Sequence, residues 1–493
     1  MILISPICRQ LGIFQPYVPV SVPMGLGYVA GYLEEQGEPI VIYDEEVASR
    51  PFDEACVDYL VSQEKAPPPY VFGFSCVTAG QARAEDMARI VRSKYPDSLI
   101  VMGGVHPTLI PSDPLEHSPT DIVVLGQGEQ TMLEVLKAFR EKGKVFDDVQ
   151  GVAFMRDEEF IKTPPRTKFL SLNDMPDFPY HFFEEFLDKY DLGWVVSSYG
   201  CPFDCVFCSQ RAITGVRVSY SENEKVIRQI RTLVEKYGVD HIWFADDNLS
   251  IKKKRILALC DDIVESGLHK KCSFDAQTRA DGVNPQILAA MKRANFRTIS
   301  YGIEVATDRL MKMIKKSETV EDCENAIRMS KEAGLDVACT FIFGWPTETA
   351  EDRKACFDLA LRFDADIVRF NNATPYPGTA LYDWVKDEPG FNPGHRWKNM
   401  NTVGALVSHP FKKPNPFSYC PPTISERQLR KVILRYNFFF SLRPRMIVQM
   451  LKNGMNLGGH FTLPKKWYYS PKEIAVFLRF CFYTMGSIFR SVV

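Results

Sequence analysis

The sequence predicts an α/β protein with a doubly wound N-terminal domain, a partial (βα)6 barrel and a mixed C-terminal cap. Its 493 residues exceed one domain, since domains usually hold roughly 100–200 residues. Two series of short apolar strands, each alternating with amphipathic helices, follow one another. Prolines at 164, 165, 176 and 179 separate the two series. We therefore expect domains at 1–145 and 191–385, a linker at 146–190 and a cap at 386–493.

The composition excludes several classes of protein. With 45% hydrophobic and 24% charged residues, the chain is not disordered, collagenous or a multi-span membrane protein. Residues 1–5 resemble a first strand rather than a signal peptide, so we expect a cytoplasmic protein. The 13 cysteines are odd in number and mostly isolated in apolar runs, which argues against a disulfide framework.

In the N-terminal domain, five short strands alternate with helices. This pattern is typical of an open, mostly parallel sheet with helices on both faces. The expected strands are Ile2–Ile4, Ile40–Tyr43, Val71–Ser75, Leu99–Met102 and Ile122–Val124. Glycines follow the last two strands, where such sheets bind ligands. They suit a nucleotide-like ligand, but the GxGxxG of NAD-binding domains is absent after the first strand.

The second series predicts a partial parallel barrel, whose active site belongs at the carboxyl ends of its strands. Its expected strands are 194–196, 241–244, 273–276, 298–301, 338–343 and 367–370. A CxxxCxxC loop with Cys201, Cys205 and Cys208 follows the first of them. Three thiolates so close in sequence converge readily on one soft metal centre. Iron–sulfur clusters normally take four thiolates, and the next cysteine, Cys260, belongs to a predicted helix, so one iron would stay open to another ligand.

A structural zinc site is the alternative for these cysteines. Such a site needs four ligands and usually a second CxxC pair, which the sequence lacks. We therefore favour the cluster.

This cysteine loop, placed after the first strand of a six-unit barrel, resembles the radical S-adenosylmethionine superfamily over about residues 191–385. The resemblance implies a [4Fe-4S] cluster whose open iron binds S-adenosylmethionine. One electron from an external flavodoxin- or ferredoxin-type donor then gives a 5′-deoxyadenosyl radical. The implied S-adenosylmethionine contacts are Phe207, Asp246, Asp247, Gln277, Arg279, Glu304 and Gly344. Each polar side chain among them has a structural alternative, as a helix cap or a rim ion pair.

The N-terminal domain resembles the cobalamin-binding domain that precedes the barrel in the B12-dependent branch of this superfamily. By that resemblance, the nucleotide tail of cobalamin follows Ser75, Gly103, Gly104, Gly126, Gly128 and Glu129. The DxHxxG histidine of other cobalamin domains is missing, and the first histidine of the chain is His106. We therefore expect no protein imidazole on cobalt, and we interpret His106 as a turn residue rather than a catalyst.

The resemblance implies methylation of an unactivated carbon in a small substrate, and the basic, aromatic C-terminal segment favours a hydrophobic or lipid-like one. A substrate radical would receive the methyl group from methylcobalamin, and two equivalents of S-adenosylmethionine would be used. Other branches of the family instead close rings oxidatively or form and rearrange C–C bonds. A cobalamin-binding sensor is a further alternative. The sequence identifies no catalytic side chain and does not name the substrate.

The C-terminal segment 421–493 is basic, with 12 Lys and Arg against two Glu. Its longest apolar run, Ile474–Phe489, is interrupted by Arg479 and is shorter than the ~20 residues that a membrane span needs. One interpretation is a structural cap on the barrel. The other is a peripheral contact with anionic lipid through basic and aromatic residues. We expect no nucleic-acid partner, because no nucleic-acid-binding motif accompanies the charge.

Overall fold

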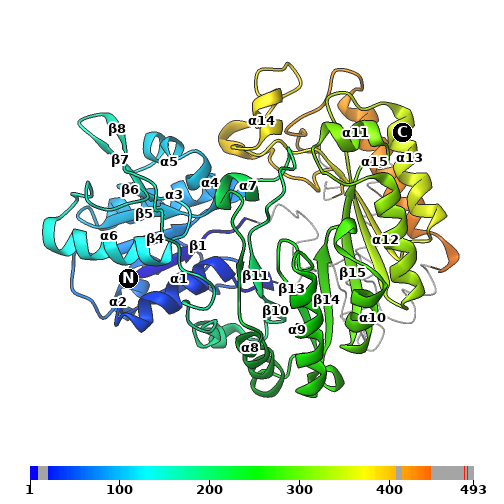
Figure 1. The fold of residues 1–493 in the computed structure, drawn as a ribbon. Helices are drawn as coiled ribbons and strands as arrows, with labels where there is room; N and C mark the ends of the chain where they lie inside the picture. Colours follow the sequence, from blue (N-terminus) through cyan, green and yellow to red (C-terminus); the bar gives the residue numbers. More distant parts are fainter. Residues whose placement is uncertain (9–19, 407–412, 446–481, 483–485, 487–493) are drawn as a thin grey trace.

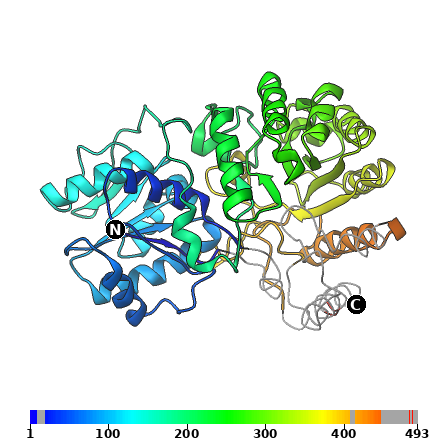
Figure 2. The same cartoon turned by 90° about the horizontal axis from the view of Figure 1, so that it is seen from below.

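The computed structural model describes residues 1–8, 20–406, 413–445, 482 and 486. It contains a mostly parallel seven-stranded sheet and a parallel six-stranded sheet side by side, each with its own helices (Figures 1 and 2). This arrangement confirms the predicted α/β class. Among the helices of the described residues, none combines the length and the apolar character that a bilayer span requires.

The first sheet has the strand order β3-β1-β4-β5-β6-β7-β8. The first five strands in this order are parallel, as predicted, and the last two pair antiparallel. The strands are β1 (Ile2–Ser5), β3 (Val41–Asp44), β4 (Val71–Ser75), β5 (Leu99–Gly103), β6 (Ile122–Val124), β7 (Val152–Arg156) and β8 (Glu159–Lys162). The chain passes from β1 to β3 on one side and to β4 on the other. A ligand crevice forms where the strand order reverses in this way.

Helices cover both faces of this sheet (Figure 1). On one face α1 (Met24–Glu35) packs beside α6 (Glu129–Lys142), and on the other α2 (Glu54–Gln63) packs beside α3 (Gln81–Lys94). Two separate apolar cores result, one on each face. The short helices α4 (Val105–Leu109) and α5 (Ser112–His117) follow β5 directly.

The segment 146–190, expected as a linker, begins with structure of its own. Its first part is the β7-β8 hairpin, which extends the N-terminal sheet because β7 pairs with β6. Val152, Ala153 and Phe154 of β7 are buried there. The turn-rich remainder contains a 3-10 helix, η3 (Tyr180–Phe186), and a short strand, β9 (Tyr190–Asp191). Strand β9 pairs with β2 (Val20–Ser21), so this remainder also returns to the N-terminal domain.

The second sheet confirms the predicted six-strand barrel unit, with all strands parallel and in sequence order. Its strands are β10 (Trp194–Val195), β13 (His241–Phe244), β14 (Ser273–Thr278), β15 (Phe296–Glu304), β16 (Asp336–Phe343) and β17 (Ile367–Asn372). The α-helices between them are α7 (Gln210–Thr214), α8 (Asn223–Lys236), α9 (Lys253–Glu265), α10 (Pro285–Arg293), α11 (Asp308–Met313), α12 (Val320–Glu332) and α13 (Ala350–Arg362). Along β16, buried Val337, Cys339 and Phe341 alternate with partly exposed Thr340 and Ile342. One face of the sheet is therefore core, and the other is left for the barrel interior.

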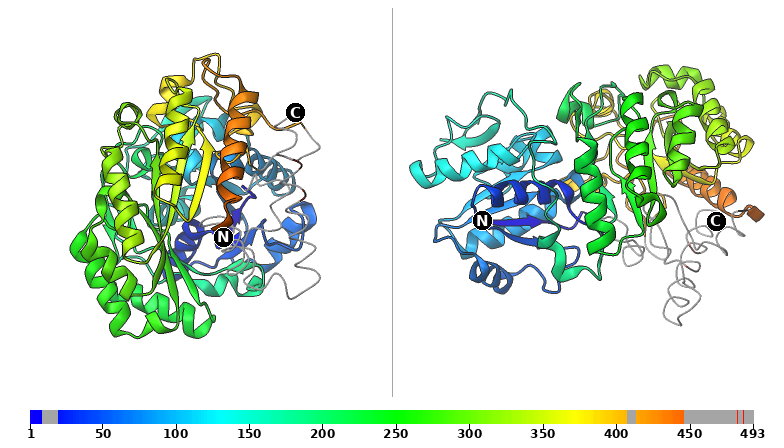
Figure 3. Two further views of the ribbon diagram at one scale, coloured as in Figure 1. Left: turned by 90° about the vertical axis from the view of Figure 1, so that its right-hand side faces the viewer. Right: turned by 60° about the horizontal axis from the view of Figure 1, so that its bottom comes forward.

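The described part of the C-terminal cap covers the last strand. Helix α15 (Glu426–Ser441) runs beside β17 (Figure 3, left). Asn437 bonds both backbone groups of Phe370, accepting from its N–H at 3.1 Å and donating to its carbonyl at 2.9 Å. The Asn437 side chain thus satisfies backbone groups that a further strand would otherwise pair with at this edge of the sheet. Along the chain, α14 (Ala380–Val385) and the 3-10 turn η6 (His395–Trp397) come between β17 and α15.

Candidate active site

The three predicted cluster cysteines lie on the loop between the short antiparallel strands β11 (Ser198–Tyr199) and β12 (Ser219–Tyr220). All three thiols are partly buried and unbonded to one another. Val206 fixes the loop in the barrel, because its N–H donates to Ile314 at 3.0 Å and its carbonyl accepts from Leu381 at 2.8 Å. In the described residues, no three His, Cys, Asp or Glu side chains are already gathered as a metal site. The cysteine assignment therefore remains a prediction from spacing and surroundings.

Two cations stand beside this loop. The guanidinium of Arg279 lies 3.5 Å from the ring centre of Phe203, between the first two cysteines, and Lys316 is buried nearby. Burial raises the pKa of Cys205 to about 11, while the charges of Lys316 and Arg279 act in the opposite direction. Bound iron needs thiolates, so this positive surrounding suits a cluster.

The adjacent aspartates that end β13 have different surroundings. The carboxylate of Asp246 is fully buried and accepts from Ser197 N and Ser197 Oγ, both at 2.7 Å, and from Ser198 Oγ at 2.5 Å. Asp247 accepts one bond, from Gly200 N at 2.8 Å, beside the first cysteine. We had expected both carboxylates to face S-adenosylmethionine. Asp246 instead anchors the start of the cluster loop, which leaves Asp247 as the better candidate.

At the end of β15, Glu304 forms part of a buried charged group. Its backbone has a φ of 68°, and its Oε2 atom has no hydrogen-bond partner in the described structure. Burial raises its pKa to about 7, although the nearby charge of Lys316 lowers it. Lys316 forms an ion pair with Glu318 at 3.0 Å. An orphaned carboxyl oxygen at a barrel mouth is a ready partner for a cationic ligand group.

Gln277, in β14, and Arg279, directly after it, bond to residues around the cysteine loop. Arg279 makes two 2.9 Å bonds to Asp281 and lies 3.6 Å from Glu318. Gln277 donates to the Asp246 carbonyl at 3.2 Å. Sequence reasoning missed Phe203, Lys316 and Glu318. Nothing local in the 315–318 turn indicates that it folds back against the cysteines, and nothing near Phe203 in the sequence indicates that Arg279 lies over its ring.

Phe207 and Gly344, both expected on the adenine side, lie close together. The Phe207 ring packs edge-on against buried Trp345, with 5.6 Å between ring centres. The N–H of Gly344 donates to Glu348 at 2.8 Å. A Cβ at Gly344 would lie 2.9 Å from Leu429 of α15, so packing against the cap is a further reason for glycine there.

A cavity of about 340 Å³ is lined by one face of the N-terminal sheet and by the carboxyl ends of β4, β5 and β6. All six residues assigned to the cobalamin tail line it: Ser75, Gly103, Gly104, Gly126, Gly128 and Glu129. The remaining walls include Leu172 and Met175 of the segment expected as a linker, and Val196 and Tyr199 just before the cysteine loop. The cavity therefore extends from the N-terminal sheet to the entrance of the barrel.

The glycines in this wall serve different purposes. At Gly126 (φ 70°) a Cβ would meet no atom within 4 Å, so a side chain there would project into open space. At Gly104 (φ 100°) a Cβ would lie 2.7 Å from the Cys76 carbonyl oxygen. Glycine in this wall is expected to let the ligand approach the backbone, but a side chain at Gly104 has a nearer neighbour than the ligand. It would collide first with the protein's own backbone.

Two family models match the chain, the B12 binding domain over residues 16–136 and the radical SAM superfamily over residues 195–360. The chain belongs to the cobalamin-dependent radical S-adenosylmethionine enzymes.

Curated relatives of this enzyme include methyltransferases and cyclases. An uncharacterized methyltransferase of Pyrococcus horikoshii is 28% identical over 87% of this chain and 89% of its own length. The anaerobic magnesium-protoporphyrin IX monomethyl ester cyclase of Cereibacter sphaeroides is 27% identical over 74% of this chain and 60% of its own. The hopanoid C-3 methylase of Methylococcus capsulatus is 25% identical over 72% and 67%.

Solved structures share the fold. The radical S-adenosylmethionine methyltransferase TsrM of Kitasatospora setae, with cobalamin and a [4Fe-4S] cluster bound, superposes with a TM-score of 0.69 at 15% identity. The match covers 90% of this chain and 89% of that one. OxsB, a cobalamin-dependent S-adenosylmethionine radical enzyme, gives 0.63 at 19% identity over 78% of this chain and 55% of that one.

The residues present fit the cofactors of this enzyme family, which are the [4Fe-4S] cluster, S-adenosylmethionine and cobalamin. Soft thiols flanked by cations suit an iron–sulfur cluster. The orphaned Glu304 oxygen suits the amino group of S-adenosylmethionine. The open space at Gly126 suits the nucleotide tail of cobalamin.

Gly126→Val is expected to abolish cobalamin binding while the fold remains intact, because the side chain would occupy the cavity. Positive φ strains any β-branched residue, so a matched control is needed. Gly143→Val provides it, since Gly143 (φ 67°) also has nothing within 4 Å of its Cβ but lies at the exposed end of α6. Equilibrium dialysis with cobalamin should show loss of binding for the first variant alone. Equal binding by both would remove Gly126 from the site.

Glu129→Gln is expected to change the pH dependence of stability in the ligand-free enzyme. The carboxyl is buried, which raises its pKa to about 7 from an ordinary 4.5. The unfolded state therefore loses its proton first, and stability falls as pH rises from about 4.5 to about 7. The loss amounts to about 3 kcal/mol. Between about pH 5 and pH 8, thermal unfolding should show a loss of stability in the wild type and in Glu141→Gln, an exposed control on the same helix. The loss should be smaller by most of this amount in Glu129→Gln, where Glu304 and Glu348 still contribute.

His106 is buried away from the cavity lining. Its Nε2 lies 3.0 Å from Asp113 Oδ2 and its Nδ1 lies 3.3 Å from Thr78 Oγ1. It lies in helix α4 rather than in a turn, and its ring is held among polar partners.

Proposed function

We propose that this enzyme transfers a methyl group to an unactivated carbon of a small substrate, with a hydrophobic or lipid-like compound as the favoured class. The observation that carries the proposal is the single cavity bounded by the glycine-lined strand ends and by Tyr199, next to the cysteine loop. It would bring a methyl donor and a radical source to one space. Methyltransferases among the relatives, including the hopanoid methylase and the cytidylyl-2-hydroxyethylphosphonate methyltransferase of Streptomyces wedmorensis, support it.

When bound, the cluster with S-adenosylmethionine supplies a hydrogen-abstracting radical and cobalamin supplies the methyl group. The chain's own residues hold these groups in place. In the proposal, Cys201, Cys205 and Cys208 ligate three irons, and Asp247 and Glu304 receive the methionine amino group. Phe207 and the Gly344 turn hold adenine, while Gln277 and Arg279 hold the frame of the cluster loop. The buried wall of Val101, Val124 and Met132 excludes water from the cavity.

Oxidative ring closure is the second candidate. Anaerobic magnesium-protoporphyrin IX monomethyl ester cyclases from three organisms match the chain at 25–27% identity over 73–74% of its length. The cyclase shares the radical step with the methyltransferase but transfers no methyl group.

One experiment separates the two candidates. The anaerobically reconstituted enzyme is given cobalamin, a flavodoxin or ferredoxin reducing system, S-adenosylmethionine with a deuterated methyl group, and small-molecule extracts. A product that carries the deuterated methyl group supports methylation. A product that lacks two hydrogens and carries no label supports ring closure. If neither 5′-deoxyadenosine nor a product forms, the enzymatic proposal fails and a cobalamin sensor becomes the better explanation.

Among the described residues, the exposed face of α15 carries the basic and apolar side chains that a contact with lipid would need. Arg427, Lys431 and Arg435 are exposed there, as are Phe439 and Leu442 further along. Phe482 is also exposed. Three other aromatic residues of the C-terminal segment, Trp467, Tyr468 and Phe480, lie outside the described residues. We propose that this face touches anionic membrane surfaces.

Arg435→Glu is expected to weaken binding to anionic vesicles roughly thirty-fold at low salt. Replacing Arg by Glu changes the charge of the side chain by two units, and each unit contributes roughly 1 kcal/mol to the free energy of binding to such a surface. Sedimentation with vesicles measures it. Lys137→Glu, an exposed charge reversal on α6, is the control. If the wild type stays in the supernatant, the lipid contact is wrong and a soluble substrate is favoured.

A further inference from the structure

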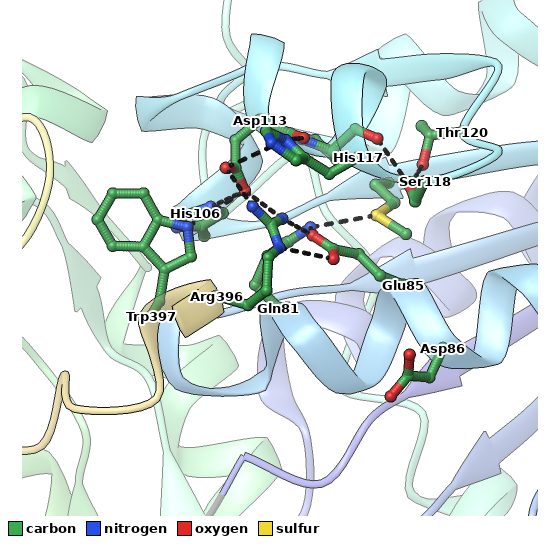
Figure 4. Close-up of polar contacts among 12 residues, drawn as sticks. Gln81, Glu85, Asp86, His106, Asp113, His117, Ser118, Thr120, Arg396 and Trp397 are labelled. Atoms are coloured by element: carbon green, nitrogen blue, oxygen red, sulfur yellow. Dashed lines mark hydrogen bonds and ion pairs between the residues drawn. The ribbon is translucent and has the colours of Figure 1, made fainter. Parts of the chain in front are cut away.

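Arg396 of η6 inserts into a carboxylate pocket of the cobalamin-binding domain (Figure 4). Its Nη1 and Nη2 atoms donate to Asp113 of α5 at 2.8 and 2.9 Å, and its Nε donates to Glu85 of α3 at 2.9 Å. Both carboxylates are almost fully buried. More than 280 residues separate Arg396 from either partner, so these ion pairs join the C-terminal region to the first domain.

A second layer surrounds the pocket. His106 of α4 approaches Asp113 from the other side, and the indole N–H of Trp397 donates to the same carboxylate at 3.3 Å. The rings of His106 and Trp397 pack edge-on, with 5.3 Å between centres. Burial alone would raise the pKa of Asp113, but the hydrogen bonds from His106 and Arg396 lower it well below its usual range. The carboxylate therefore stays charged and ready to bind the guanidinium.

The backbone of η6 is held in an unfavourable shape. Arg396 has φ 48° and ψ 49°, and Trp397 has φ 64°. Two successive non-glycine residues in the left-handed region persist only where their surroundings fix them. Here the fixing contacts are the ion pairs and the indole bond.

The other end of the same segment is tied to the barrel mouth. Asn372, the last residue of β17, donates its N–H to Thr402 at 3.1 Å and its side-chain amide to Asn401 at 2.9 Å. Residues 392–404 therefore form a strap from the sixth barrel strand to α3 and α5. We call this segment the interdomain strap.

On the first domain, α4 links the strap's anchor to the cavity. The helix starts directly after Gly103 and Gly104 of the cavity wall, and it carries His106. The C-terminal end of α4 also meets the barrel mouth, because a Cβ at Gly378 would lie 2.8 Å from Leu109. A continuous set of contacts thus runs from the cavity wall through His106, Asp113 and Arg396 to the end of β17.

We propose that Arg396 is a positioning residue that fixes the cobalamin cavity against the barrel mouth through the interdomain strap. The inference rests on the proposed function, in which the two domains must act on one substrate. Without the guanidinium, Glu85 would keep a 3.1 Å bond from Gln81 and a 3.9 Å ion pair with Arg89, and Asp113 would keep its contacts with His106, Trp397 and His117. Both buried carboxylates would lose their closest permanently charged partner. Such carboxylates become hydrated, which releases the strap. The barrel's own chemistry would continue, but chemistry that needs both domains would slow.

The first test needs no ligand. Hydrogen exchange is measured on the full-length protein for Arg396→Ala, Arg396→Lys and Arg92→Ala. Arg92 pairs with Asp121 at 2.5 Å inside the first domain and serves as the matched control. We expect the rate of amide hydrogen exchange in residues 392–404 and 105–117 to rise at least about ten-fold in Arg396→Ala. The rise should be smaller in Arg396→Lys, which keeps the positive charge but loses the planar guanidinium that bonds two carboxylates at once. Unchanged exchange at these residues, or an equal rise in Arg92→Ala, would overturn the proposal.

The second test uses two products of S-adenosylmethionine in the reconstituted enzyme with cobalamin and reductant. Release of 5′-deoxyadenosine requires only the barrel, whereas release of S-adenosylhomocysteine requires methyl transfer to cob(I)alamin in the other domain. We expect Arg396→Ala to lower the second at least about ten-fold and to leave the first and cobalamin binding within about two-fold. A parallel fall in both would indicate a merely structural role. If the wild type releases no S-adenosylhomocysteine, the methyltransferase proposal fails, while hydrogen exchange still tests the strap.

Discussion

Cys201→Ala, Cys205→Ala and Cys208→Ala are each expected to abolish reductive cleavage of S-adenosylmethionine. Two thiolates cannot hold a four-iron cluster with one iron open, so neither the cluster nor its electron transfer should survive. The loop itself should remain in place, because Val206 attaches it through two backbone bonds that involve no cysteine side chain. Iron and sulfide content after anaerobic reconstitution, together with 5′-deoxyadenosine release, measures the effect.

Cys260→Ala is the control for these variants, because Cys260 is buried in α9 away from the loop. It should keep its iron and its cleavage activity. Stoichiometric zinc in the wild type, without the visible absorption of an iron–sulfur cluster, would contradict the assignment of the three cysteines.

Asp246→Ala is expected to destabilise the barrel domain by about 3–5 kcal/mol and so to lower its unfolding temperature by about 10 °C. The buried carboxylate accepts three bonds from Ser197 and Ser198, and its removal would leave these donors without a partner. Thermal unfolding followed by circular dichroism measures the shift.

Asp247→Ala is the matched comparison, one residue along the same strand end. It loses a single bond to Gly200, so we expect a stability change of only about 1 kcal/mol. Binding of S-adenosylmethionine to the reconstituted enzyme should nevertheless fall at least about ten-fold. If Asp246→Ala proves as stable as Asp247→Ala, the anchoring role assigned to Asp246 is wrong.

The sequence by itself determined the succession of strands and helices along the chain and the chemistry of the loops. Period-two and helical patterns are local, so they predicted both sheets and the six-strand barrel. The CxxxCxxC spacing is also local, because three nearby cysteines can reach one centre under almost any backbone path. The glycines after β5 and β6 marked the cavity wall for the same reason, since strand ends lie at a known edge of the sheet.

The hairpin at 152–162 shows where local pattern was insufficient. The prolines that follow it made the whole segment resemble a linker. Strand β7 of this hairpin pairs with β6. The free edge of β6 exists only in the folded sheet, so no local pattern indicates that a hairpin will add to it.

Only the tertiary structure decided which polar side chains do what. Asp246 and Asp247 are identical in type and adjacent in sequence, yet the fold gives three donors to the first and one to the second. Lys316 and Arg396 act on residues far away in the chain, beside Cys205 and between Glu85 and Asp113. The physical reason is that a periodic pattern fixes which face of an element is buried. The partner of a buried charge is fixed by how whole domains pack, and no short stretch of sequence contains that information.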